Sequence, residues 1–215
     1  MDKKDRLKII YEDKHILIVD KKAGLLTIGT EKEKEHTLYH KVYEYLKKKN
    51  QKVFIVHRLD KDTSGLVLFA KSEKAKYLLQ ENWDSVKRKY YAIVYGNNCP
   101  SKGTIKIKLN ESKTLKTYID IHNGKLAITE YRKIREKGKY SLLDINLLTG
   151  RKNQIRVSLN YIGYPIIGDK KYGEAPNPLR RLCLHAYYLE FVHPITHEKL
   201  KFEVSFPQVF SNLID

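Results

Sequence analysis

The stretch VFIVHRLDKDTSGLVLFA, residues 53–70, places a strongly polar segment between two apolar runs. The runs VFIV and LVLFA are short and rich in β-branched and aromatic side chains, which is typical of buried strands. Between them, residues 57–65 carry one arginine, one lysine, two aspartates and two hydroxyl side chains. Such a segment is either a solvated turn or the place where polar side chains do chemistry.

Working outward, similar apolar runs recur at residues 16–19, 53–56, 66–69, 90–95, 104–109, 140–148, 182–191 and 200–206. Three other segments suit helices: residues 36–49 with Thr37 as a cap, 72–82 opened by Ser72, and 153–162 with apolar residues at helical spacing. Strands outnumber helices and mostly follow one another directly. The expected fold class is therefore α+β, with a mixed, mainly antiparallel central sheet flanked by a few helices.

The 215 residues contain no Pro-, Gly- or Ser-rich linker and no internal repeat, so we expect one domain over residues 1–215. The two cysteines, Cys99 and Cys183, do not have the number or spacing of a disulfide framework or a zinc cluster. Neither a signal peptide nor an apolar stretch near ~18 residues is present, so a cytoplasmic location with no membrane partner is expected. The lack of a long apolar segment favours a monomer.

The chain is strongly basic. Its 42 Lys and Arg exceed its 25 Asp and Glu, which gives a net charge of +17 and a pI near 9.6. Basic residues cluster at 3–6, 47–52, 87–89 and 180–181, and 16 Tyr and 6 Phe offer faces for stacking bases. These features favour RNA or DNA as the partner. A lysine-rich composition without such a partner and an acidic membrane surface are the alternatives.

Three patterns that are typical of nucleotide or metal sites are incomplete in this chain, so no metal or cofactor is expected. GYPIIGDK, residues 163–170, has two glycines at P-loop spacing, but Asp169 stands where the phosphate-binding lysine must follow. DKDTSG opens like a calcium loop, yet Lys71 occupies the place of the bidentate Glu. Two histidine pairs lack a third ligand nearby: His36 with His40, and His193 with His197.

HRLDKDTSGLVLFAK resembles the signature of the RluA-type pseudouridine synthases, HRLD followed by two variable residues and TSG. Further stretches in chain order are similar to blocks of that family: EDKHILIVDKKAGL near the start, RKYYAIVYG at 88–96, LLTGRKNQIRVSL at 147–159, GYPIIGDKKYG at 163–173 and LCLHAYYLEFVHP at 182–194. The resemblance covers nearly the whole chain. It implies the pseudouridine synthase catalytic fold, here expected without the separate S4 RNA-binding domain that many relatives carry.

The resemblance also implies the chemistry. Members break the N1 glycosidic bond of a uridine in RNA, rotate the uracil and rejoin it through C5, with one Asp and no cofactor. Asp60 matches that Asp. A carboxylate suits the reaction because it is a nucleophile that can also leave, and attack on the sugar, attack on the base and abstraction of a sugar proton stay open as its role. Tyr90 matches the tyrosine on which the uracil packs. Arg156 resembles the arginine that pairs with the catalytic carboxylate, which would keep Asp60 ionised.

A uridine stacked in folded RNA must be flipped out to react, at a cost of a few kcal/mol. Arg58 matches the family arginine that fills the vacated place in the stack, a role that suits a planar cation. His57 and Arg151, in the same matching motifs, are expected to bind RNA as well. Asp62 falls at a variable position, and an Asx-type turn is its expected role.

Three positions depart from the family pattern: Lys22 stands for the usual proline, Arg88 for a lysine and Asn153 for a histidine. They leave the main assignment unchanged, which is isomerisation of uridine to pseudouridine in structured ribosomal RNA or tRNA. A non-catalytic RNA-binding or remodelling protein on the same scaffold is the alternative, and the joint presence of Asp60, Tyr90 and Arg156 speaks against it. A glycoside hydrolase using Asp60 and Asp62 is a weaker reading, because carboxylates two residues apart on a turn flank one bond poorly.

Overall fold

The structure is a computed structural model that describes residues 6–29, 33–96 and 98–215. Lys3 and Lys4 of the first basic cluster lie outside the described residues. The chain divides into two compact units: unit 1 comprises Met1–Val86 and Tyr188–Val204, and unit 2 comprises Lys87–Tyr187 and Ser205–Asp215. The expectation of one catalytic domain over residues 1–215 stays a prediction.

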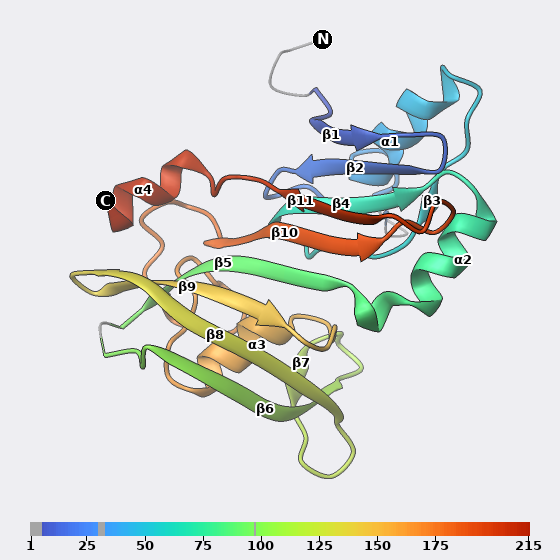
Figure 1. The fold of residues 1–215 in the computed structure, drawn as a ribbon. Helices are drawn as coiled ribbons and strands as arrows, with labels where there is room; N and C mark the ends of the chain where they lie inside the picture. The colour runs from blue at the N-terminus through green and yellow to red at the C-terminus, as the bar shows by residue number, and fades with distance from the viewer. Residues whose placement is uncertain (1–5, 30–32, 97) are drawn as a thin grey trace. The chain divides into compact units, whose positions relative to one another are not determined.

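Unit 1 is built on antiparallel strands (Figure 1). The hairpin of β1 (Ile9–Glu12) and β2 (Ile16–Lys21) continues into β4 (Ser64–Ala70), which also pairs with the short β3 (Phe54–Ile55). Strand β11 (Lys199–Glu203) pairs with the last five residues of β10 (Leu184–Val192). The helices of this unit are α1 (Leu38–Lys47) and α2 (Glu73–Glu81), and a 3₁₀ turn follows at Trp83–Ser85.

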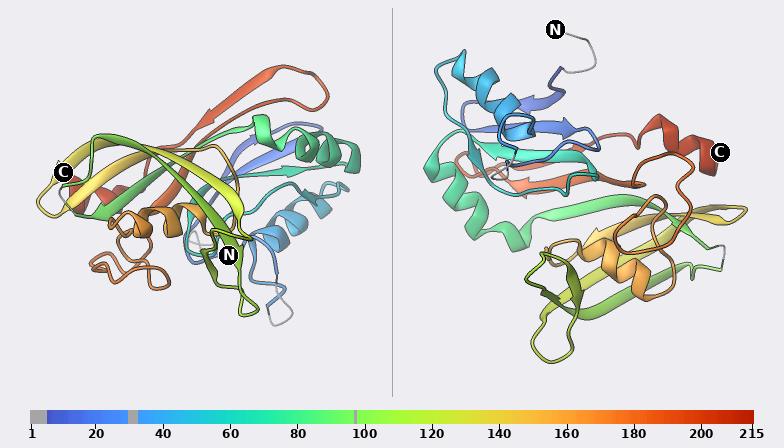
Figure 2. Two further views of the ribbon diagram at one scale, coloured as in Figure 1. Left: turned by 90° about the horizontal axis from the view of Figure 1, so that it is seen from below. Right: turned by 180° about the vertical axis from the view of Figure 1, so that it is seen from behind.

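Strands β2 and β4 of unit 1 are buried on both faces. Ile16 and Ile18 of β2 join a cluster with Leu66 and Leu68 of β4 and with Ala75 and Leu79 of α2. The alternate residues of the same strands, Leu17, Val19, Val67 and Phe69, are also fully buried. Because successive strand side chains point to opposite faces, a second layer must cover them. Helix α1 has buried Leu38, Val42 and Leu46, and Figure 2 shows α1 and α2 on opposite sides of these strands.

Unit 2 is a curved antiparallel sheet with the strand order β5-β9-β8-β6-β7. Its strands are β5 (Lys87–Tyr95), β6 (Lys102–Glu111), β7 (Thr117–Ile119), β8 (Lys125–Lys137) and β9 (Tyr140–Leu147). Helix α3 (Gln154–Tyr161) packs against β6, β7 and β8 on one face (Figure 2). A 3₁₀ turn at Gln208–Phe210 and α4 (Ser211–Ile214) end the chain.

The α+β class and the mainly antiparallel sheet are confirmed. The three predicted helices are present, and Thr37 and Ser72 accept hydrogen bonds from the backbone N–H of His40 and Ala75 as N-caps. Strands β1, β7 and β8 were not predicted. Inside the described ranges, no helix combines the length and apolar character needed to cross a bilayer.

Candidate active site

The polar segment of residues 57–63 is a tight connection between two paired strands of unit 1. Phe54 lies opposite Ala70, and Ile55 opposite Phe69, so the chain leaves β3 and returns into fully buried β4. A turn closes where the Thr63 N–H donates to the Asp60 carbonyl at 3.2 Å. Asp60 is half-buried, whereas Arg58 and Asp62 are exposed. The sequence therefore presents Asp60 on a turn whose two ends are fixed by a buried sheet.

Buried Thr27 holds the residue that precedes Asp60. The Thr27 hydroxyl donates to the Leu59 carbonyl at 2.7 Å, and its oxygen accepts from the Leu59 N–H at 3.2 Å. Thr27 is 2% exposed and Leu59 5% exposed. A single side chain 32 residues away thus satisfies both backbone groups of Leu59, which fixes the peptide plane on one side of Asp60.

Buried Lys21 holds the residue that follows Asp60. Its ammonium donates to the carbonyls of Lys61 at 2.9 Å, Leu25 at 2.7 Å and Lys22 at 3.1 Å, and Lys21 is 1% exposed. Three carbonyls match the three protons of an ammonium, which is how a buried cation is tolerated. The Gly24 N–H also donates to the Lys61 carbonyl, at 2.9 Å. The main chain is therefore held on both sides of Asp60.

The His57 ring is directed into unit 1. Its Nε2 accepts from the Leu68 N–H at 3.0 Å, so we assign the proton to Nδ1. The ring stacks on Trp83, with centroids 4.5 Å apart and planes at 29°. His57 thus helps to fix the start of the turn on β4. Its expected contact with RNA, like that of exposed Arg58, stays a prediction.

Two candidate residues belong to unit 2. Tyr90 lies on β5 opposite Ile145 and is 8% exposed. Arg156, on α3, forms a buried bidentate ion pair with Asp169: Nε donates at 2.8 Å and Nη2 at 2.7 Å. Its guanidinium carbon lies 5.1 Å from the centre of the Tyr172 ring. A planar guanidinium held this way has a fixed direction.

Asp169 organises the loop after α3. Besides Arg156, its Oδ1 accepts from the backbone N–H of Lys171 at 2.9 Å and of Tyr172 at 3.1 Å. Burial would raise the pKa of Asp169, but the Arg156 guanidinium and these N–H groups outweigh it and lower the pKa. The aspartate that breaks the P-loop pattern therefore acts as the ionic partner of Arg156.

Two of the positions that depart from the family pattern are buried in unit 2. Asn153 adopts the left-handed conformation at φ 52°, which Asn tolerates well. Its Oδ1 accepts from Arg156 Nη1 at 3.3 Å, and its Nδ2 donates to the Tyr172 hydroxyl at 2.9 Å. Arg88 is buried beside Gly150, where an added Cβ would lie 2.8 Å from Arg88 Nη1.

Exposed Arg151 donates from Nε to the Leu126 carbonyl at 3.1 Å.

The structure brings His57, Arg58 and Asp60 together in unit 1. Tyr90, Arg151 and Arg156 belong to unit 2, so the predicted pairing of Arg156 with Asp60 stays a prediction. Sequence reasoning missed the roles of Thr27, Lys21 and Asp169. Lys21 and Asp169 lie within stretches that resemble family blocks. This resemblance was the one sequence feature that could have pointed to their roles.

Comparison with known proteins matches residues 15–161 to the RNA pseudouridylate synthase family model. An uncharacterised RNA pseudouridine synthase of Bacillus subtilis, YhcT, is 37% identical over 96% of this chain and 71% of its own length. The ribosomal large subunit pseudouridine synthase D of Pseudomonas aeruginosa is 34% identical over 95% of this chain and 69% of its own.

The fold agrees with these relatives. The solved structure of human RNA pseudouridylate synthase domain containing 4 matches 95% of this chain and 90% of its own, with a TM-score of 0.80 and 25% identity. The family model covers both the turn that carries Asp60 and the helix that carries Arg156. On these grounds, the chain belongs to the RNA pseudouridylate synthase family.

Proposed function

We propose that this chain converts uridine to pseudouridine in structured RNA with Asp60 as its catalytic carboxylate. Membership of the RNA pseudouridylate synthase family supports the proposed type of reaction. The observation that supports Asp60 is the turn itself: buried Thr27 and Lys21 hold the peptide groups on both sides of this residue. A catalytic group needs such a rigid support, because small misplacements cost large factors in rate.

In the proposed reaction the N1 glycosidic bond breaks, the uracil turns, and a C5–C1′ bond forms, with loss of the C5 proton and gain of a proton at N1. The Asp60 carboxylate serves as nucleophile or base. Tyr90 packs under the flipped uracil, and Arg156, directed by Asp169, keeps the carboxylate ionised. Arg58 fills the gap left by the flipped base, while His57 and Arg151 contribute to RNA binding. The atoms of substrate and product are the same, so no co-substrate is required.

Ribosomal RNA and tRNA are the proposed substrates. A relative that is 34% identical over 95% of this chain is named a ribosomal large subunit pseudouridine synthase, so large-subunit RNA is the substrate to test first. The net charge of +17 suits a phosphate-rich partner. A cytoplasmic location and a monomeric state stay predictions.

The test uses RNA labelled with tritium at C5 of uridine, isolated from cells that lack this protein. Tritium release by the wild-type protein and none by Asp60→Asn is the expected result, with RNA affinity close to normal in the variant. Asp62→Asn is the matched control: it removes an exposed carboxylate two residues away and should keep its activity. Release by Asp60→Asn at the wild-type rate would refute the role of Asp60. Tight RNA binding without any release by wild type would favour the non-catalytic RNA-binding alternative.

A further inference from the structure

Two adjoining hollows lie in unit 1 between the segment that leads into β1 and one side of α1. Their volumes are about 700 and 290 Å³. Both are lined by Arg6, Leu7, Lys8 and Lys41, so they are direct neighbours, and together they are named here the β1–α1 groove. Helix α1 and its C-cap contribute residues at intervals of four, namely His40, Glu44 and Lys48, and these lie on one face of a helix.

The β1–α1 groove is basic. Five cationic side chains line it: Arg6, Lys8, Lys22, Lys41 and Lys48. Two carboxylates face them. Asp20 accepts from Lys8 at 2.7 Å, and Glu44 lies 4.0 Å from Lys47. Apolar Leu7, Ile9, Leu25 and Leu38 also line it. Cationic and apolar groups side by side match a chain of phosphates that carries sugars and bases.

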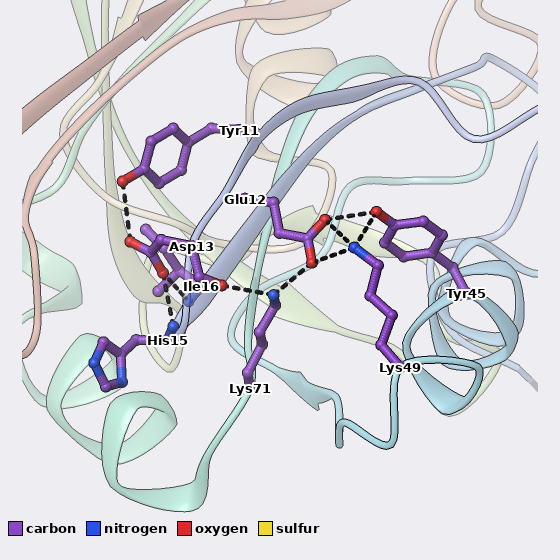
Figure 3. A network of polar contacts seen from close by, with 8 residues as sticks. All are labelled: Tyr11, Glu12, Asp13, His15, Ile16, Tyr45, Lys49 and Lys71. Atoms are coloured by element: carbon purple, nitrogen blue, oxygen red, sulfur yellow. Dashed lines mark hydrogen bonds and ion pairs between the residues drawn. The ribbon is translucent and has the colours of Figure 1, made fainter.

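The walls of the β1–α1 groove are held in place by Glu12 (Figure 3). Its carboxylate accepts from Tyr45, near the C-terminal end of α1, at 2.6 Å and from Lys49, just beyond the C-cap of α1, at 3.0 Å. On the other side it accepts at 2.6 Å from Lys71, whose side chain is 4% exposed. This network ties α1 to β1 and to the end of β4. The groove is therefore preformed, which lowers the entropic cost of binding.

One end of the β1–α1 groove lies against the support of the candidate catalytic turn. Residues 22–25 line this end. Within them, the Gly24 N–H donates to the Lys61 carbonyl at 2.9 Å, and Lys61 follows Asp60 directly. This end of the groove is therefore one backbone hydrogen bond away from the residue that follows Asp60. Lys41 and Lys48 are seven positions apart, or roughly 10 Å along α1, which is the length of about three stacked nucleotides.

We propose that the β1–α1 groove binds the single-stranded RNA next to the target uridine through its phosphates. This inference rests on the proposed function, and it names the part of the substrate that unit 1 holds beyond the reacting nucleotide. The groove then binds the flanking RNA strand, while the turn at Asp60 catalyses the reaction.

The test removes three charges from the groove with Arg6→Gln, Lys41→Gln and Lys48→Gln together. The matched control, Lys14→Gln with Lys74→Gln and Lys76→Gln, removes three charges from parts of unit 1 that do not line the groove. Both sets are made in Asp60→Asn, so that binding is read without turnover. The probe is a fluorescein-labelled oligouridylate of about twelve nucleotides, within the ~4–16 nucleotide range of single-strand sites, titrated at several salt concentrations.

We expect the groove variant to lower the slope of log K against log salt by about 2, since each contact on a single strand adds about 0.7. Its affinity near 0.1 M salt should fall roughly 10- to 100-fold, with little change in the control. Equal losses in both variants would overturn the proposal.

A second measurement does not depend on these variants. A 4-thiouridine at either end of the oligouridylate, irradiated on the Asp60→Asn protein, should cross-link to peptides that contain residues 6–9 or 40–48. Cross-links confined to other peptides would also overturn the proposal. Absence of tritium release by wild type, with groove-dependent binding intact, would instead refute only the proposed function.

Discussion

Thr27→Val isolates the hydrogen bonds that hold the peptide before Asp60. Valine has nearly the shape of threonine but no hydroxyl, so the change removes both bonds to Leu59 and leaves its N–H and carbonyl without that partner. Each buried backbone group that loses its partner costs about 1–3 kcal/mol. The extra methyl offsets a part of this. We expect the free energy of unfolding to fall by about 2–4 kcal/mol, a large share of the ~5–15 kcal/mol of a typical protein.

The same change should slow the reaction. Leu59 precedes Asp60, so a loosened Leu59 peptide lets the carboxylate move, and a displacement near 1 Å can cost about 100-fold in rate. We expect kcat of tritium release to fall roughly 10- to 100-fold while KM for RNA changes little, because Thr27 is buried away from solvent.

Thr27→Ser is the control, since serine keeps the hydroxyl and loses one methyl group. Its unfolding free energy should stay within about 1.5 kcal/mol of wild type, and its kcat should stay close to wild type. Urea unfolding and tritium release are measured on all three proteins. If Thr27→Val matched Thr27→Ser in both measurements, the reasoning that Thr27 positions the catalytic turn would be refuted.

Two further predictions concern ion pairs with buried partners, namely Lys71 and Arg156. Burial alone would raise the pKa of Glu12, but hydrogen bonds from Lys71, Tyr45 and Lys49 lower it from 4.5 to about 2. Glu12 therefore stabilises the fold above about pH 4.5, and this is lost as pH falls toward 2. Glu12→Gln should remove ~1–2 kcal/mol at pH 7, after solvent screening, and flatten urea-measured stability between pH 5 and 2; an unchanged profile would contradict this. Asp169→Asn should cost about 3–5 kcal/mol in thermal unfolding and lower kcat, because buried Arg156 loses its charge partner. Asp215→Asn, which breaks an exposed pair with Arg135, should cost under about 1 kcal/mol, and equal losses would argue against the Asp169 role.

The strands that were predicted and those that were missed differ in what their inward side chains are. Strand β4 contains the continuous apolar run LVLFA, which predicts a strand from the sequence alone. Strand β8 (Lys125–Lys137) turns only Ala127, Thr129 and Tyr131 inward, while its other positions mix charged side chains with the apolar Leu126, Ile128 and Ile134, which are not buried. Two of these three inward side chains are small or polar, so the alternation that marks a strand is weak. Pairing with β6 and β9 on both sides makes it a strand all the same.

The candidate site also has a part that the sequence predicts and a part that it does not. The turn and its aspartate were predicted because a polar motif between two apolar runs is a local pattern. The roles of Lys21 and Lys71 were not, because an isolated lysine in a sequence is ordinarily an exposed one. Both are buried here, and each is satisfied by partners far along the chain, at Lys61 and Glu12.

The sequence by itself determined the local features of this protein: capped helices at Thr37 and Ser72, apolar strands, a basic surface and the family motif around Asp60. Each of these depends on neighbouring residues or on composition. The tertiary structure decided which side chains hold that motif, namely Thr27 and Lys21 at the turn, and that Asp169 binds Arg156. The physical reason is that a buried polar group must find a partner in space, and the fold chooses that partner from any distance along the chain.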